Sequence, residues 1–173
     1  LGYVLAIGGY TTASGRLADV YAYNPKSNSW SKRGPMHVGR SNPAIGAVAS
    51  TIVAAGGVVS GSGYTTDNEA LFRSGKWHTK ATVPTAVAAP CSGATGAKLY
   101  MAGGETAGGI TAAAAVYTLH TDTWSTSLAP MPQSQVGAAS AMKAGILYCI
   151  GGASQGYPNG STTFYDNVQI YKP

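Results

Sequence analysis

The chain has 173 residues, of which 45% are hydrophobic and only 10% are charged. This hydrophobic content excludes an intrinsically disordered chain, and the 24 glycines together with the low charge disfavour long amphipathic helices. The formal net charge is +5, but the Lys and Arg residues are scattered and form no basic run, and no apolar stretch is long enough for a membrane helix. We therefore expect a folded chain of strands and turns that binds neither nucleic acid nor a membrane.

Two sequence markers repeat along the chain with the same period. Double glycines and tryptophans both recur every 47 or 48 residues, at Gly8-Gly9, Gly56-Gly57, Gly103-Gly104 and Gly151-Gly152 and at Trp30, Trp77 and Trp124. Because two independent markers keep one period, we infer a repeat architecture.

Each repeat unit is expected to form four short strands. In the first complete unit these are a strand of small residues at 44–50, an apolar strand at 51–57 that ends in the double glycine, a third strand from Glu69, and a strand around Trp77. Small side chains fit where wedge-shaped sheets converge, whereas a Trp ring fills the wide space between sheets at the outer rim. Neighbouring units must stack to bury their faces.

The chain contains four such units, and the outer two are incomplete. Residues 1–43 lack a first strand, residues 44–89 and 90–135 form complete units, and residues 136–173 lack a last strand.

These units resemble the Kelch repeat, in which a strand ending in Gly-Gly is followed by a Tyr-bearing strand and then a Trp. The closest copy is the first unit, with AIGG from Ala6, VYAYNP from Val20, Trp30, and PMHVGR ending at Arg40. Later units depart from it: Ala70–Arg73 replaces the Tyr-bearing strand, and Val87 and Gln135 replace Arg40. The resemblance implies an all-β fold, a β-propeller of Kelch-type four-stranded antiparallel blades, with about three and a half blades in this chain.

A Kelch propeller usually closes into a ring of more blades than this chain provides, so we expect an incomplete ring. Three explanations remain open: the chain is a segment of a longer protein, two chains complete one ring, or the ring closes in an unusual short form. Open blade faces and strand edges would favour self-association.

The sequence predicts no catalytic residue, metal site or cofactor. His37, His78 and His120 fall on different parts of different blades, and Cys91 and Cys149 match no metal motif and are expected to be two small buried hydrophobic residues. Asp19, Asp67 and Asp166 recur at the start of the third strand, which indicates a structural role. Glu105 is the best single candidate for a general base or a ligand contact. The sequon Asn159-Gly160-Ser161 weakly favours secretion.

Strand connectivity places the loops between strands two and three on the same face as the links between blades. These loops are long and variable, and such loops on a rigid scaffold often carry binding residues. Tyr and Arg are common at binding hot spots, so the candidate ligand-binding residues are Tyr10, Arg16, Arg40, Tyr64, Glu105, Gln155 and Tyr157.

The resemblance favours a non-catalytic binding module that presents this face to a protein or peptide partner. Two alternatives stay open. One is part of a sugar-active Kelch enzyme similar to galactose oxidase or to sialic acid mutarotases. The other is an extracellular carbohydrate-binding domain.

Overall fold

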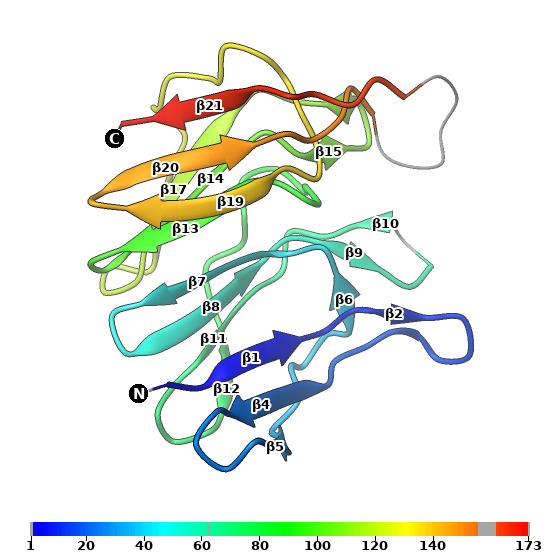
Figure 1. Cartoon of the computed structure of the whole chain (residues 1–173), viewed down its shortest axis with the longest axis vertical. Coiled ribbons are helices and arrows are strands. Elements are labelled where there is room, and N and C mark those ends of the chain that lie inside the picture. Colours follow the sequence, from blue (N-terminus) through cyan, green and yellow to red (C-terminus); the bar gives the residue numbers. More distant parts are fainter. Residues whose placement is uncertain (1, 62, 156–161, 173) are drawn as a thin grey trace.

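A computed structural model of the chain describes residues 2–61, 63–155 and 162–172. All regular elements in these ranges are β-strands, and the longer ones form four antiparallel sheets that fan out side by side (Figure 1). The prediction of an all-β, incomplete propeller is therefore confirmed. None of the described residues belongs to a helix long and apolar enough to cross a membrane.

The four sheets are numbered here as blades in chain order. Their strands are, in blade 1, β1 (Val4–Ile7), β4 (Val20–Asn24) and β5 (Ser29–Arg33); in blade 2, β7 (Ala44–Val48), β8 (Thr51–Ala55), β11 (Asn68–Leu71) and β12 (Trp77–Thr79); in blade 3, β13 (Cys91–Thr95), β14 (Lys98–Ala102), β17 (Ala114–Thr118) and β18 (Thr123–Ser125); and in blade 4, β19 (Ala139–Lys143), β20 (Ile146–Ile150) and β21 (Val168–Tyr171).

Short two-residue strands extend the loops on one face. They are β2 (Tyr10–Thr11) with β3 (Gly15–Arg16), β6 (Arg40–Ser41) with β9 (Val58–Val59) and β10 (Gly63–Tyr64), and β15 (Glu105–Thr106) with β16 (Gly109–Ile110). Figure 1 shows β2, β10 and β15 projecting from the same side of the molecule. We call this side the loop face.

Small residues in the first strands allow neighbouring blades to approach closely. β13 lies between β7 and β19. A Cβ atom added at Gly46 would lie 2.6 Å from Leu99 Cδ1, and one added at Gly93 would lie 2.9 Å from the Cβ of Met142. Because both distances are below van der Waals contact, only glycine fits at these positions without a shift of the next blade.

The tryptophans of blades 2 and 3 join successive blades at the outer rim. The indole N–H of Trp77 donates to the carbonyl of Gly34 at 3.0 Å, and that of Trp124 donates to the carbonyl of Ala81 at 2.9 Å. Burial of the ring and satisfaction of its one donor therefore both depend on the preceding blade.

The expectation for the two cysteines was wrong in one respect. Cys91 and Cys149 are both buried, as expected, but they form a disulfide that joins β13 of blade 3 to β20 of blade 4. Their different strand positions argued against pairing when each blade was considered alone. Blades stack face to face, however, and β13 packs against β20 as well as β19. Residues at different positions in two repeats therefore meet.

Candidate functional site

Each link between blades is attached to the double glycine of the blade it leaves. The amide of the second glycine donates to a link carbonyl in three successive blades: Gly9 to Arg40 at 2.9 Å, Gly57 to Val87 at 2.8 Å, and Gly104 to Gln135 at 2.7 Å. Arg40, Val87 and Gln135 are therefore structurally equivalent, as the repeat alignment predicted.

The structure removes Arg40 from the predicted binding surface. Its side chain is 0% exposed and forms an ion pair with Glu69. Its Nη1 atom also donates to the carbonyl of Asp67 at 2.7 Å and to that of Gly56 at 3.3 Å. A guanidinium so fully paired inside the protein holds blades 1 and 2 together and does not contact a ligand on the loop face.

Glu69 is the partner that the sequence interpretation missed. Besides the guanidinium, its carboxylate accepts a hydrogen bond from the backbone amide of His37 at 2.8 Å, and it lies 2.9 Å from the His37 Nδ1 atom. The sequence pattern drew attention to the recurring Asp67 instead, because Glu69 has no acidic counterpart in the other blades. Only the fold shows that it faces Arg40.

Tyr10 and Arg16 form a separate group on the hairpin of blade 1. The Arg16 guanidinium lies over the Tyr10 ring, 4.5 Å from its centroid, and the ring is mostly exposed. This pair is built within one hairpin, and neither residue lines the cavity described next.

Glu105 and Gln155 come together in one cavity on the loop face. The cavity has a volume of about 360 Å³ and lies where the links entering blades 2, 3 and 4 converge. We call it the central cavity. Its described lining residues are Asn42, Val58, Ala88, Ala89, Glu105, Val136, Gly137, Gly152, Ala153, Gln155, Thr162 and Phe164. Two residues chosen from separate loops of the sequence thus share a single site.

Tyr64 lies close enough to Glu105 for the carboxylate to interact electrostatically with the phenol. Partial burial raises the pKa of Tyr64 above its usual value, and the nearby Glu105 carboxylate raises it further. The phenol therefore stays protonated beside the carboxylate. Tyr157 and the sequon Asn159-Gly160-Ser161 lie outside the described residues.

Backbone hydrogen bonds hold the links together beneath the central cavity. The amide of Ala89 donates to the carbonyl of Asn42 at 2.8 Å, and the amide of Gly137 donates to the carbonyl of Ala89 at 3.0 Å. All three residues have positive φ angles, between 49° and 68°. The same turn thus recurs in three blades and gives the cavity a rigid floor.

A second cavity lies next to the central cavity, between blades 2 and 3. It has a volume of about 590 Å³, and we call it the junction pocket. Its lining residues are Val83, Pro84, Thr85, Val87, Met101, Gly103, Thr106, Thr111, Ala113, Ala114, Ala115, Thr126, Leu128 and Pro130. None of these residues was a sequence candidate, although Val87 in place of Arg40 was a visible departure from the repeat.

The part of the chain that the structure describes contains no group of three His, Cys, Asp or Glu side chains arranged to hold a metal ion. Within the same ranges, the central cavity is lined by one carboxylate, Glu105, and by no histidine or cysteine. The arrangement offers a hydrogen-bond acceptor, an amide and backbone groups, which suits binding through polar contacts.

Comparisons with known proteins agree with the fold. A family model described as the Kelch motif matches residues 2–37. The solved structure of YjhT superposes with a TM-score of 0.80 at 20% sequence identity, covering 99% of this chain and 66% of that one. This chain therefore spans about two thirds of the length of that structure. A search of curated proteins found no match.

The Kelch motif at residues 2–37 and the four fanned sheets together show an incomplete β-propeller with Kelch-type blades. This fold serves as a scaffold for both binding modules and enzymes, so the function depends on the residues of the site.

Proposed function

We propose that this propeller is a non-catalytic binding module that holds a peptide segment of a protein partner on its loop face. The observation that carries the proposal is the meeting of Glu105 and Gln155, from corresponding loops of blades 3 and 4, in the central cavity. Loops on a rigid scaffold commonly carry binding residues. The hydrogen-bonded links beneath this cavity make such a scaffold.

The chemistry of the central cavity supports a peptide ligand with hydrogen-bond donors. Glu105 supplies a carboxylate, and Gln155 adds an amide. The Phe164 ring, 73% exposed at the edge of the cavity, adds apolar contact area. A basic side chain or a run of peptide amides would complement Glu105, and charge-assisted hydrogen bonds of this kind are stronger than neutral ones.

Selection from a displayed peptide library tests the proposal. Peptides enriched on the wild-type protein should bind Glu105→Gln at least about tenfold more weakly, because this change removes the charge and keeps the shape. Lys143→Ala is the matched control, since Lys143 ends β19 at a turn on the opposite face, and it should change affinity less than about twofold.

Two results would contradict the proposal. One is the failure of any peptide to be enriched over a library passed across the matrix alone. The other is a set of enriched peptides that bind Glu105→Gln and Gln155→Ala as tightly as the wild type.

A further inference from the structure

Three successive blade junctions carry equivalent pairs of facing positions, and two of these pairs are long polar side chains. At the junction of blades 1 and 2, Arg40 forms its buried ion pair with Glu69. At the junction of blades 3 and 4, the side-chain amide of Gln169 donates to the side-chain oxygen of Gln135 at 2.7 Å. Each pair reaches from the link of one blade to the third strand of the next and fills the space between them.

The junction of blades 2 and 3 has lost this pair. Val87 stands at the position of Arg40 and Gln135. The strand register places Ala115 at the position of Glu69, because Glu69 pairs with Ala54 on β8, and Ala115 pairs with Met101, the equivalent of Ala54, on β14. Two long polar side chains are therefore replaced by two short apolar ones.

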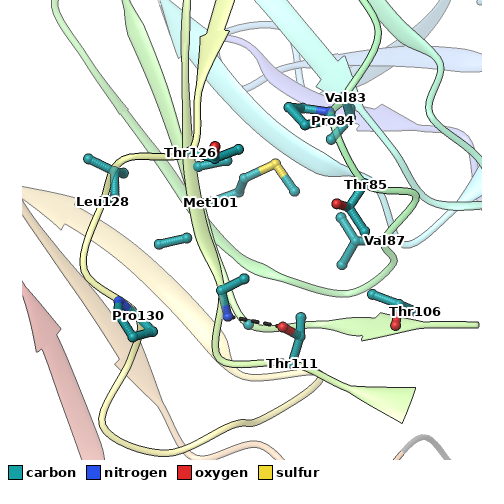
Figure 2. A pocket seen from close by; sticks show the side chains of 14 residues that line it. Val83, Pro84, Thr85, Val87, Met101, Thr106, Thr111, Thr126, Leu128 and Pro130 are labelled. Atoms are coloured by element: carbon teal, nitrogen blue, oxygen red, sulfur yellow. Dashed lines mark hydrogen bonds between the residues drawn. The ribbon is translucent and has the colours of Figure 1, made fainter. Parts of the chain in front are cut away.

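The junction pocket lies at this place and is lined by both Val87 and Ala115. A third position also carries a shorter side chain at this junction, with Val83 in place of Met36. Val83 donates its amide to the carbonyl of Thr66, just as Met36 does to Ala18 in the junction before. Figure 2 shows Val83, Thr85 and Val87 on one side of the hollow, Thr126, Leu128 and Pro130 on the other, and Met101 between them. The pocket is thus open space where the other junctions hold side chains.

The walls of the junction pocket define the chemistry of an occupant. None of the 14 lining residues is charged. Val87, Met101 and Leu128 supply aliphatic surface, and the hydroxyls of Thr106 and Thr111 are hydrogen-bonded within their own loop. A charged group would lose its hydration there without meeting a side chain of opposite charge, whereas an aliphatic group would gain by leaving water.

The junction pocket and the central cavity are separated by a single backbone bridge. The amide of Ala88 donates to the carbonyl of Glu105 at 2.9 Å, and the amide of Glu105 donates to the carbonyl of Ala88 at 2.8 Å. Successive side chains of a strand point to opposite sides. Glu105 accordingly lines the central cavity, and Thr106 lines the junction pocket. One extended peptide lying across this bridge would reach both cavities.

We propose that the junction pocket binds an aliphatic side chain, of the size of leucine, from the same peptide that contacts Glu105. The proposal rests on the proposed function for its peptide, but the preference of the pocket for an uncharged aliphatic group can be measured alone. The ligand class is therefore a peptide with an aliphatic residue close to a basic or amide-donating one.

The first experiment uses a small probe and needs no partner. N-acetyl-leucine methylamide, titrated into the methyl-labelled chain, should shift the NMR signals of Val87, Met101 and Leu128 saturably in the millimolar range, and N-acetyl-lysine methylamide should not. The double variant Val87→Gln/Ala115→Gln copies the junction of blades 3 and 4 and should abolish the shifts. Ala115→Val fills the pocket less and should weaken them, which guards against misfolding of the double variant.

The second experiment uses the selected peptides. Replacement of their aliphatic residue by alanine should weaken binding to the wild type about tenfold or more and to Val87→Gln/Ala115→Gln less than about twofold. If peptides need Glu105 but are insensitive to the double variant, the pocket proposal is overturned and the proposed function stands. If no peptide is enriched but the leucine probe binds at Val87, the proposed function fails and the pocket preference stands. Absence of probe shifts in the wild type overturns the pocket proposal.

Discussion

Trp30 and Trp77 occupy the same place in successive blades, yet one is 56% exposed and the other 5%. Contact with a tyrosine of its own blade is not enough to bury Trp30, because the partly buried Trp124 makes the same contact. Tyr23 and Trp30 of blade 1 lie 5.2 Å apart between ring centroids, the same as Tyr117 and Trp124 of blade 3. What differs is the neighbour, because Trp77 packs on blade 1 and Trp30 has no blade before it among the described residues.

The same contrast extends over the outer and inner blades. Among the described residues, the large hydrophobic side chains that are strongly exposed all lie in blades 1 and 4: Tyr3, Val4, Tyr10, Tyr21, Trp30, Ile150, Phe164, Val168 and Ile170. A repeat thus specifies which side chain stands at each position, while stability depends on whether the adjacent blade covers it.

The largest expected effect follows from this contrast. Trp77→Ala should lower the free energy of unfolding by about 4 to 5 kcal/mol, because it leaves a cavity between blades and an unpaired carbonyl at Gly34. Trp30→Ala should lower it by less than about 1 kcal/mol. Urea denaturation followed by tryptophan fluorescence measures both, and similar losses for the two variants would show that burial between blades is not what stabilises the rim.

The buried ion pair between blades 1 and 2 should give the next largest effect. Glu69→Ala leaves the Arg40 guanidinium buried without its carboxylate and should cost about 3 to 4 kcal/mol. The double variant Arg40→Val/Glu69→Ala copies the junction of blades 2 and 3, and it should be more stable than Glu69→Ala alone. Thermal unfolding of the three proteins checks the order; a double variant less stable than the single one would contradict it.

The disulfide should contribute somewhat less to the free energy of unfolding than the buried ion pair does. It joins residues 58 positions apart, so it restricts a long loop of the unfolded chain, and its loss should cost about 2 to 3 kcal/mol. Unfolding with and without dithiothreitol measures this, and Cys91→Ala/Cys149→Ala, which should be insensitive to the reductant, is the control. Because cytosolic thiols are kept reduced, full stability is expected only in an oxidising environment. A reductant effect as large in the double variant as in the wild type would assign the loss to another cause.

Sequence patterns predicted the structural features that recur in every blade. They did not predict the side-chain contacts between neighbouring blades. The spacing of glycines and tryptophans was enough to predict the four sheets and the equivalence of Arg40, Val87 and Gln135. Burial of Arg40 by Glu69 depends on how one sheet packs on the next, and neither residue has a like-charged counterpart in the other repeats. At the junction of blades 2 and 3, Val87 and Ala115 stand at the positions of Arg40 and Glu69. The sequence shows this replacement, but only the packing of the blades shows that it leaves an open pocket.

The candidate site was also predicted only in part from the sequence. Glu105 and Gln155 were chosen because each lies in a long loop, and the fold brings them together because corresponding loops of adjacent blades lie side by side. Tyr64 was chosen as an isolated aromatic residue, but in the structure it lies near Glu105. Loop position therefore predicted that these residues lie on one face, whereas their proximity to one another depends on how the blades pack.

The smallest expected effect on stability concerns a turn that contains a charged hydrogen-bond acceptor in blade 3 and a neutral one in blade 1. The Tyr117 hydroxyl donates to the Asp122 carboxylate at 2.7 Å, and at the equivalent place in blade 1 the Tyr23 hydroxyl donates to the side-chain oxygen of Asn28 at 2.9 Å. Burial alone would raise the pKa of Asp122, but hydrogen bonds from Tyr117 and from the Ala81 amide, with the nearby Lys80 charge, outweigh it and lower the pKa.

A carboxyl whose pKa is lower in the folded state stabilises the fold above its unfolded pKa, near 4, and loses that contribution as the pH falls through the folded value. Tyr117→Phe should therefore cost about 1 kcal/mol at pH 7, limited by the partial exposure of Asp122, and less at pH 2 to 3. Tyr23→Phe, acting on a neutral partner, should cost no more than Tyr117→Phe at pH 7, and its cost should not change over this range. Urea unfolding at the two pH values, with an NMR titration of the Asp122 carboxyl, measures the difference. An Asp122 pKa that does not rise in Tyr117→Phe would show that the hydrogen bond is not what sets it.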